Sequence, residues 1–464
     1  MLLEKKLIEE LLEAGLSRGA DFSEVFVENT QSSMLQSLSG RLEAVNSSKS
    51  FGIGIRVAKR YKTVYGYTNS KNPEDLHKLA DDLSKSFDGE ALTTRKPLME
   101  LEVGNRHGVQ IKPNEVSLEE KVNYIKKAYK AAEEYDDAIK QVIVGLSDST
   151  QEVLIANSEG RFVTETRVRV RVRVNSVASK DGVMQTGGES PGSGKGYEYL
   201  FNEIDIEEYA KSASRIAMTM LNAEECPSGV MPVVIHNGFG GVIFHESCGH
   251  PLEATSVAKN ASVFCGKMGE KVASDVVTAI DDGTLENRWG SANYDDEGYP
   301  QQRRVLIEKG ILKSYMVDKI NGRRMSAEPT GSSRRQNYKF APTSRMSNTY
   351  IDNGESTFDE IVAATKYGLF AKKLGGGSVN PGNGDFNFAV MEGYMIRDGK
   401  IAEPVRGASL VGNGGNILHK IDMVGNNLDS GRGMCGSVSG SIPADVGQPT
   451  LRVTEITVGG KRGA

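Results

Sequence analysis

A strict alternation of arginine and valine runs from Arg167 to Val174. Side chains on a β-strand point in turn to the two faces of a sheet, whereas an α-helix repeats every 3.6 residues. The alternation therefore predicts a half-buried strand with valines on one face and arginines on the other. We expect the arginine face to be solvated or salt-bridged, because one basic strand in an acidic chain is weak support for a phosphate site.

Helical and strand patterns follow the same order twice in the N-terminal half. Residues 1–100 start with apolar positions at helical spacing, continue with period-two strands and end with a helix at about 73–87. Residues 113–225 repeat this order, with helical patterns at 118–134 and 204–221 around three strand-like runs. We therefore expect two α+β modules, joined by a charged, turn-rich linker.

The composition changes at about Pro227. Of 52 glycines, 35 lie in the last 238 residues, together with hairpin signals such as GYMIRDGKIAEPV. Residues 227–464 are therefore expected to form a largely antiparallel, β-rich domain. Because 464 residues are too many for one core, the expected fold class is α+β, with N-terminal α/β modules followed by this β-rich C-terminal domain.

The overall composition excludes several classes of protein. A net charge of -5 gives no support for direct binding of nucleic acid or of a membrane surface. The N-terminus lacks the basic start and unbroken apolar run of a signal peptide, and no stretch approaches the length of a membrane span. Four cysteines are too few for a disulfide framework in a chain of this size. We therefore expect a cytoplasmic protein.

The segment FHESCGHPLE, residues 244–253, places His245 and His250 five residues apart. The zinc-protease signature H-E-x-x-H has one residue fewer between its histidines. Residues five apart in a regular helix lie about 140° apart around its axis, so both imidazoles could not hold one ion. A π-bulge would return them to one face, Gly249 can adopt angles closed to other residues, and Pro251 biases the preceding residue away from the α region. The spacing therefore predicts a distorted helix end.

The residue types in this segment suit a hydrolytic metal site. Two neutral imidazoles bind Zn²⁺, a third protein ligand completes the set, and a fourth position keeps a water whose pKa falls toward about 7. Glu246 can take a proton from that water as general base and return it to a leaving amine. The alternative is two ordinary histidines at a helix end beside an exposed glutamate, and the spacing alone does not separate the two interpretations.

The third ligand has several candidates elsewhere in the sequence. Cys435 is the first choice, because the glycines around it in GRGMCGSVSG let the backbone approach another element closely. Glu253 is the second choice and would give a site with only nitrogen and oxygen ligands. Cys248 is expected to be a small packed residue, and His236 and His419 remain as other candidates.

Two charged segments after the histidine motif are expected at the surface. The run from Asp295 to Glu297 could orient a ligand imidazole or contact a peptide amine, but clustered Asp, Glu, Gly and Pro favour an exposed turn. The segment GSSRRQNYKFAPTSR could contact nucleic acid or a substrate carboxylate, and a solvated loop is favoured for it. Its cations are Arg334, Arg335, Lys339 and Arg345.

Several separated motifs resemble, in the right order, the TldD branch of the TldD/PmbA family. They include MPVVIHNGFGGVIFHESCGHPLEA, DDGTLENRWGSANYDDEGYP, SRMSNTYI, GASLVGNG and GMCGSVSGSIPADVGQPTLRV. The likeness covers nearly the whole chain and is most specific after Pro227.

The resemblance implies a metallopeptidase of the H-E-x-x-x-H type with a β-rich C-terminal metal domain. It implies one zinc ion per chain, held by His245, His250 and Cys435, with Glu246 as the catalytic glutamate. It also implies peptide substrates that lie extended along a sheet edge, maturation of a peptide antibiotic that targets DNA gyrase, and degradation of an antitoxin. The family's older label, gyrase modulator, comes from these two processing roles. The assembly implied is a homodimer or a heterodimer with a PmbA/TldE-like subunit that lacks the metal motif.

The leading interpretation is a zinc-dependent peptidase that acts on short or unfolded peptides. A non-catalytic peptide- or gyrase-associated binding scaffold is an alternative, and so is an amidase that uses the same groups on a non-peptide bond. Salt-sensitive duplex binding without peptide cleavage would favour the scaffold, whereas only substrate screening separates the amidase.

Overall fold

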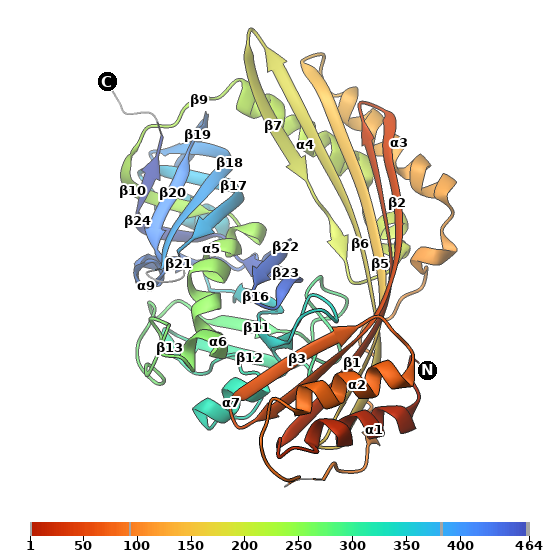
Figure 1. Ribbon diagram of the computed structural model, residues 1–464. Coiled ribbons are helices and arrows are strands. Elements are labelled where there is room, and N and C mark those ends of the chain that lie inside the picture. Colours follow the sequence, from red (N-terminus) through yellow and green to blue (C-terminus); the bar gives the residue numbers. More distant parts are fainter. Residues whose placement is uncertain (1, 92–93, 381–383, 461–464) are drawn as a thin grey trace.

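A computed structural model of the protein describes residues 2–91, 94–380 and 384–460. One long sheet forms the N-terminal half, in the order β3-β2-β1-β5-β6-β4, with β7 and β8 paired to β6 (Figure 1). Its strands are β1 (Phe22–Leu38), β2 (Arg41–Lys59), β3 (Lys62–Thr68), β4 (Met99–Glu100), β5 (Ile139–Asn157), β6 (Arg161–Lys180), β7 (Val183–Glu189) and β8 (Gly192–Ser193).

The central pair of this sheet, β1 and β5, joins the two expected N-terminal modules. The strands pair antiparallel over a long register, from Glu24 opposite Asn157 to Leu38 opposite Ile143. The modules therefore share one sheet: β1, β2 and β3 of the first module lie on one side and the strands of the second on the other, with the short β4 of the first module paired to β6.

Helices cover one face of this sheet, and the C-terminal domain covers the other (Figure 1). Val25 and Val27 belong to a core with the first two helices, whereas Phe26 between them packs with Tyr294 and Tyr338 of the C-terminal domain. This is the alternation that a strand imposes on consecutive side chains. The helices of the described N-terminal half are α1 (Lys5–Leu16), α2 (Pro73–Ser84), η1 (Pro113–Glu115), α3 (Leu118–Glu133), η2 (Tyr199–Glu203) and α4 (Ile206–Leu221).

The arginine–valine alternation lies in β6, so the predicted strand is confirmed. Val170 and Val172 are buried in the core that also contains apolar residues of α3 and α4. The arginines face the C-terminal domain, where Nη1 of Arg167 donates to Oδ1 of Asp296 at 2.7 Å. The face is thus salt-bridged at Arg167, but most of it is covered by protein and not solvated.

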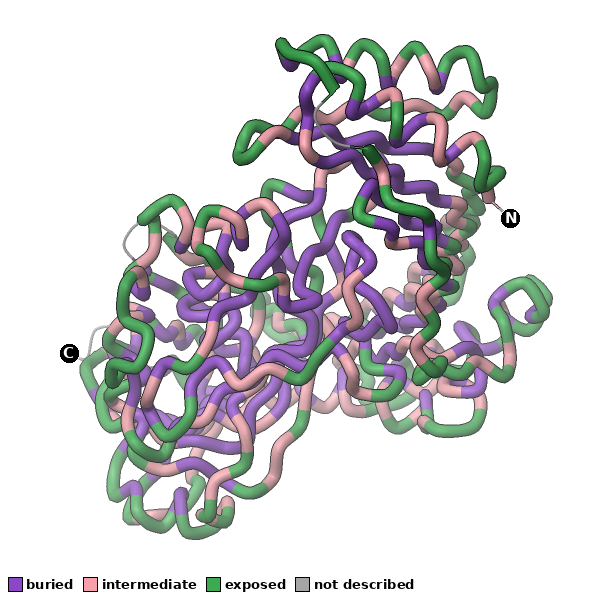
Figure 2. Tube along the Cα trace, turned by 90° about the horizontal axis from the view of Figure 1, so that it is seen from below, coloured by how far each residue is buried: buried purple, intermediate pink, exposed green. Residues whose placement is uncertain are grey.

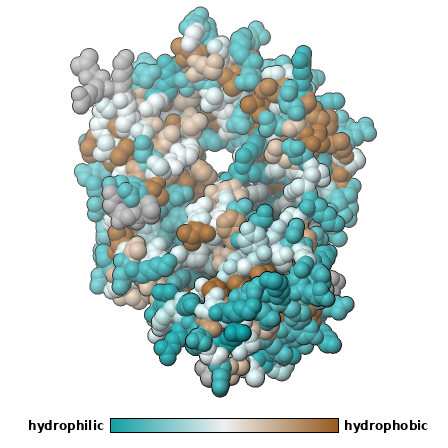
Figure 3. Space-filling view, in the orientation of Figure 1, coloured by the Kyte–Doolittle hydropathy of each residue, from teal (hydrophilic) through white to brown (hydrophobic). Residues whose placement is uncertain are grey.

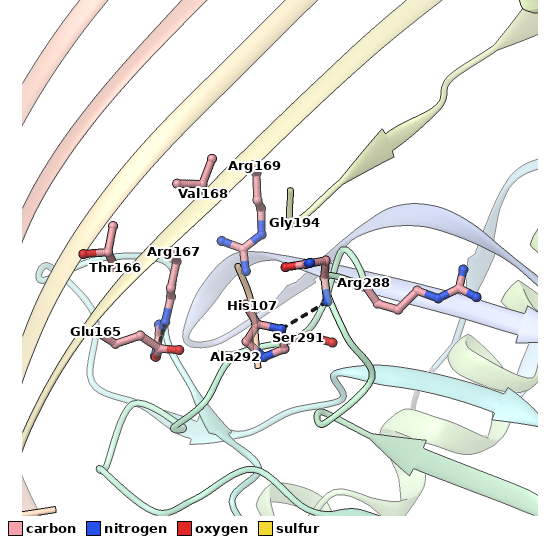
Figure 4. A pocket seen from close by; sticks show the side chains of 11 residues that line it. His107, Glu165, Thr166, Arg167, Val168, Arg169, Gly194, Arg288, Ser291 and Ala292 are labelled. Carbon is pink, nitrogen blue, oxygen red and sulfur yellow. Dashed lines mark hydrogen bonds and ion pairs between the residues drawn. The ribbon is translucent and has the colours of Figure 1, made fainter. Parts of the chain in front are cut away.

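A close view of this interface shows Arg167 and Arg169 projecting from β6 toward the loop that carries Ser291 and Ala292 (Figure 4). Nε of Arg169 donates to the carbonyl oxygen of Trp289 at 3.0 Å. The cavity between these groups measures about 10 Å³, which is no more than the space of one water molecule. The two halves are therefore closely packed here.

The acidic run from Asp295 to Glu297 is buried, so the expected exposed turn is wrong. Oε1 of Glu297 lies 2.6 Å from Nη2 of Arg56 on β2, and Asp296 pairs with Arg167 on β6. Buried carboxylates are tolerated when they are paired with cations and hydrogen-bonded. The run therefore serves as counter-charge to the N-terminal sheet.

The basic segment after it is likewise not a solvated loop. Arg334, Arg335 and Arg345 are buried, and of its four cations only Lys339 is exposed. Nη2 of Arg335 lies 2.6 Å from Oε1 of Glu24 on β1. The segment therefore belongs to the interface between the N-terminal sheet and the C-terminal domain.

The C-terminal domain contains two large sheets around one core, which confirms the expected β-rich α+β fold. One has the order β17-β10-β24-β20-β18-β19-β9, with β21 paired to β24, and it closes on itself through a further β17–β18 pairing. The other has the order β13-β12-β11-β16-β23-β22. Most pairings in both sheets are antiparallel.

The strands of the closed sheet are β9 (Glu224–Glu225), β10 (Gly229–Ile235), β17 (Tyr367–Val379), β18 (Asp385–Arg397), β19 (Lys400–Arg406), β20 (Ser409–Asn413), β21 (Ile421–Val424) and β24 (Leu451–Gly459). Those of the second sheet are β11 (Ala279–Asp282), β12 (Arg303–Glu308), β13 (Ile311–Leu312), β16 (Asn348–Ile351), β22 (Asp429–Ser437) and β23 (Gly440–Gln448). A two-stranded sheet consists of β14 (Ser333–Arg334) and β15 (Thr343–Ser344).

A broken helix enters the core between these two sheets. Its apolar residues Val242, Phe244 and Leu252 share one buried cluster with residues of both sheets. Its consecutive parts are η3 (Gly238–Gly241), α5 (Val242–Phe244), η4 (His245–Gly249), η5 (His250–Leu252) and α6 (Ala254–Val257). The other helices of the described domain are α7 (Lys319–Met325), α8 (Phe358–Ala363), α9 (Gly414–Ile417) and η6 (Leu418–Lys420).

Burial follows this arrangement. Figure 2 shows buried residues gathered inside the C-terminal domain and along the strands that meet it, while the outer helices and hairpin ends carry many exposed ones. Within the described ranges, no helix is long and apolar enough to cross a membrane. Cys226, Cys248, Cys265 and Cys435 are all free thiols.

Candidate metal centre

The histidine motif lies in the distorted part of the broken helix. Residues His245–Gly249 form a π-helical turn, closed by a hydrogen bond from the backbone N–H of His250 to the carbonyl oxygen of His245. This bond links positions i and i+5, so both histidines return to the same face. The predicted helix distortion is confirmed.

Two details of the expected distortion differ. His250 keeps α-helical angles (φ -57°, ψ -42°) despite Pro251, and the helical backbone is interrupted only at Glu253, after a short 3-10 turn and before α6. Gly249 also has helical angles, so its backbone freedom is not used. Its role is close packing, because a Cβ at this position would lie 2.2 Å from Sδ of Met346.

Cys435 lies opposite the two histidines, on the edge strand β22 of the second sheet. Its Sγ is 3.3 Å from Nε2 of His250, and the rings of His245 and His250 meet at 81° with centroids 5.3 Å apart. One potential ligand atom from each residue lies within 4.8 Å of the other two. Tetrahedral zinc separates such ligand atoms by about 3.3 to 3.8 Å, so small side-chain movements would fit an ion.

Two glutamates flank this cluster on different sides. Oε2 of Glu246 lies 3.8 Å from Nε2 of His250, and the Glu246 side chain is 28% exposed. Glu253 is buried, and its Oε1 lies 3.1 Å from Nδ1 of the His250 ring. Glu253 therefore orients His250, so that Nε2 faces Cys435, and does not itself join the cluster. Glu246 is the carboxylate that solvent can reach.

Arg345 lies between Cys435 on β22 and Glu253 at the end of the histidine motif, where it was not expected. It is completely buried and donates from Nη2 to the carbonyl oxygen of Cys435 at 2.5 Å. Its Nε lies 3.9 Å from Oε1 of Glu253. Sequence reasoning assigned this arginine to a solvated loop, although it stands second in the motif SRMSNTYI, and that position was the available signal.

Electrostatics favour a thiolate at Cys435. Burial alone would raise the pKa of its thiol, but the neighbouring His245 and His250 outweigh burial and hold that pKa well below its usual range. Burial likewise opposes charge on His250, but Glu253 and Cys435 raise the net pKa of its imidazole. Since the thiolate is the metal-binding form of cysteine, the donor set suits a divalent ion such as zinc.

A buried polar atom without a hydrogen-bond partner also supports a metal at this site. Nδ1 of His245 is buried and has no hydrogen-bond partner among the described residues. A buried nitrogen without a partner costs free energy, and a bound ligand or water would remove that cost. His245, His250 and Cys435 therefore offer a site that is chemically and geometrically suited to a metal.

The remaining candidate ligands lie elsewhere in the structure. Cys248 is packed inside the core, where burial raises the pKa of its thiol to about 12, as expected for a structural residue. The His236 ring packs edge-on against Phe358 and Phe370. His419 is exposed in η6.

Three domains of one protein family match this chain in order. The PmbA/TldA metallopeptidase domain 1 matches residues 23–87, the central domain matches residues 111–221, and the C-terminal domain matches residues 228–460. The C-terminal match contains the whole His-His-Cys cluster.

Curated relatives extend the likeness over nearly the full length. The chain is 37% identical to the metalloprotease TldD homolog of Buchnera aphidicola, over 88% of this chain and 86% of the relative. It is 36% identical to the metalloprotease TldD homolog of Haemophilus influenzae, over 96% of this chain and 94% of the relative. The zinc metalloprotease TldD homolog of Saccharolobus solfataricus is 28% identical, over 71% of this chain and 68% of the relative.

Solved structures share the fold at lower identity. A candidate modulator of a DNA gyrase from Thermotoga maritima superposes with a TM-score of 0.77 at 23% identity, covering 94% of this chain and 96% of that one. TldE from Thermococcus kodakarensis superposes with a TM-score of 0.76 at 19% identity, covering 98% of this chain and 100% of that one.

Proposed function

Because this chain belongs to the PmbA/TldA metallopeptidase family, we propose that it is a zinc-dependent peptidase that hydrolyses short or unfolded peptides. His245, His250 and Cys435 would hold one zinc ion per chain. The observation that carries this proposal is the meeting of these three side chains across the π-helical turn and β22. The word zinc in the name of one relative supports the choice of metal.

Zinc bound in such a site supplies a Lewis acid that polarises a scissile carbonyl and makes a water molecule nucleophilic at neutral pH. The residues of the chain supply the rest. Glu246 takes a proton on its carboxylate oxygen and returns it to the nitrogen of the leaving amine. Its position beside His250 and its exposure to solvent suit that role. Arg345 and Glu253 keep the two ligand-bearing elements in register.

The experiment that tests this function measures zinc content and peptide hydrolysis on the same preparation, purified without chelator. We expect about one zinc per chain and hydrolysis of unfolded peptides that chelation stops and zinc restores. A preparation without stoichiometric zinc that still cleaves peptides would contradict the proposal.

Glu253→Gln is expected to weaken zinc binding by roughly 10- to 100-fold, the usual cost of changing a group that orients a histidine ligand. The amide keeps the shape of the side chain but removes the charge beside Nδ1 of His250. Competition with a chelator of known zinc affinity measures the change. Glu198→Gln is the matched control, because Glu198 is also buried but accepts backbone N–H groups far from the site. Equal zinc affinity in both variants would contradict this role for Glu253.

A subunit partnership completes the proposal. The shared fold with TldE from Thermococcus kodakarensis supports pairing of this chain with a second subunit of the same architecture. We propose that the active unit is such a dimer, of one or of two kinds of chain, and that it acts in the cytoplasm, where thiols such as that of Cys435 stay reduced.

A further inference from the structure

A cavity of about 730 Å³ separates the upper part of the N-terminal sheet from the C-terminal domain. Its walls come from β6, β7 and α4 on one side and from the turn before the broken helix, β17, β18 and β22 on the other. Figure 3 shows the molecular surface hollowed between these two parts. The volume lies within the range of ligand-binding cavities, which is about 300 to 1,000 Å³.

Cationic side chains outnumber acidic ones on these walls by six to three. Two of the acids already have cationic partners: Glu392 pairs with Arg215 and Lys372, and Glu189 pairs with Lys373. The third acid, Asp429, accepts a hydrogen bond from the backbone N–H of Ser430. Of the six cations, Arg171 and Arg173 form no ion pair with a described acidic residue, and Arg432 has only Asp445, at 4.0 Å from its Nε.

These three arginines, which we call the arginine cluster, lie on adjoining walls of the cavity. Nη2 of Arg171 donates to the carbonyl oxygen of Arg432 at 2.9 Å, which brings β6 against β22. Burial, together with the charges of Arg173 and Arg432, lowers the pKa of Arg171 to about 10. Mutual repulsion of this kind is relieved when an anion binds among the cations.

Each member of the cluster is short of acidic partners. Arg173 is exposed and makes no ion pair or side-chain hydrogen bond with any described residue. Nε of Arg171 donates to the hydroxyl oxygen of Ser190, a neutral group. Arg432 donates mainly to carbonyl oxygens, and its nearest carboxylate, on Asp445, is 4.0 Å away.

We propose that the arginine cluster binds a carboxylate of the peptide substrate. A guanidinium presents paired N–H donors that match a carboxylate in a bidentate geometry, and three such groups line one cavity here. The three acids on the same walls disfavour a polyanion such as nucleic acid, whereas the arginines that lack a close acidic partner can accept a carboxylate. This inference rests on the proposed peptidase function and adds the substrate class that the site prefers.

The position of the cluster relates it to the metal centre. Arg432 precedes Cys435 by three residues on the edge strand β22, so the two side chains lie on opposite faces of that strand, about 10 Å apart along it. The wall that contains Arg432 also includes Phe239 and Gly240 of η3, the first turn of the broken helix that carries His245. An extended peptide spans about 3.3 to 3.6 Å per residue, and it must pass the edge of β22 to reach both sites, so its carboxylate would sit more than about three residues from the cleaved bond. The expected activity is thus removal of short segments next to a carboxylate, such as the C-terminal end of a chain.

Peptide binding tests this proposal without cleavage. Fluorescence anisotropy would compare one labelled peptide with a free C-terminus, the same peptide amidated, and the amidated peptide with glutamate as its last residue. The full chain carries Glu246→Gln, which keeps the peptides intact. We expect the free carboxylate to bind roughly tenfold tighter than the amide, as a charge-assisted interaction provides. Recovery of that affinity by the glutamate peptide would assign the same site to side-chain carboxylates as well.

Arg173→Met is expected to remove this carboxylate preference. Arg173 is exposed, so its replacement leaves the buried core intact, and Arg171→Met combined with it tests the rest of the cluster. Arg41→Met is the matched control, because Arg41 is an exposed strand arginine at the far end of β2. Equal binding of acid and amide, or a preference that survives in the double variant, overturns the proposal.

The two proposals fail in different ways. Wild-type protein that prefers carboxylates but cleaves no peptide would contradict the peptidase function alone. Peptide cleavage without any carboxylate preference would contradict the arginine cluster alone. Mass spectrometry of the products then gives the distance between the cleaved bond and the carboxylate, for which we expect more than about three residues.

Discussion

Glu246→Gln is expected to lower kcat/KM for peptide hydrolysis by roughly 10²- to 10⁴-fold, the range that a positioned general base contributes. The carboxylate lies beside the ligand cluster, 3.8 Å from Nε2 of His250, and is open to solvent. An amide of the same shape cannot accept a proton at neutral pH. Because Glu246 is separate from the three candidate ligands, zinc content should remain at the wild-type value.

Steady-state kinetics and elemental analysis of the same sample measure both parts of this prediction. Glu203→Gln is a suitable control, because Glu203 is an exposed glutamate that pairs with Lys195 in the N-terminal half. Wild-type activity in Glu246→Gln would exclude Glu246 as the base. Loss of zinc together with activity would instead make Glu246 part of the metal-binding set.

Cys435→Ala is expected to abolish stoichiometric zinc binding and, with it, peptide hydrolysis. Two imidazoles remain, but the buried thiolate, whose Sγ lies 3.3 Å from Nε2 of His250, is gone. Loss of a direct ligand should weaken zinc binding by more than the roughly 10- to 100-fold caused by changes to outer groups. Because Cys435 lies on an edge strand and alanine suits its small space, the β22–β23 pairing should persist.

Zinc titration by calorimetry and a thermal unfolding curve distinguish these effects. Cys226→Ala is the matched control, because Cys226 is also a buried free thiol but lies at the start of the C-terminal domain. Full zinc occupancy in Cys435→Ala would show that the third ligand is another residue. Glu253, whose Oε1 lies 3.1 Å from Nδ1 of His250, would then be the first to examine.

Local sequence patterns anticipated the secondary structure well. The alternation at Arg167–Val174 predicts a strand because the two-residue period is a property of the extended backbone, and β6 contains it. The five-residue spacing of His245 and His250 excludes a regular helix if both act together, and the π-helical turn agrees with that reasoning. In both cases the period of the backbone decides the result, and the period is visible in the sequence.

Charged segments were the main source of error. Asp295–Glu297 and Arg334–Arg335 were expected at the surface, since charged residues usually remain solvated. They are buried because their partners, Arg56, Glu24 and Arg167, come from strands far away in the sequence. Local composition contains no information about such pairing.

The sequence by itself determined the strand and helix periods, the β-rich character of the C-terminal domain and a short set of possible metal ligands. Tertiary structure decided which of these ligands meet, because Cys435 reaches the histidines only through the pairing of β22 with β23 at the edge of a sheet. It also decided that Arg345 lies behind the site and that Arg171, Arg173 and Arg432 share one cavity. The physical reason is that local backbone preferences act over a few residues, whereas ligand sets and charge pairs depend on contacts between residues hundreds of positions apart.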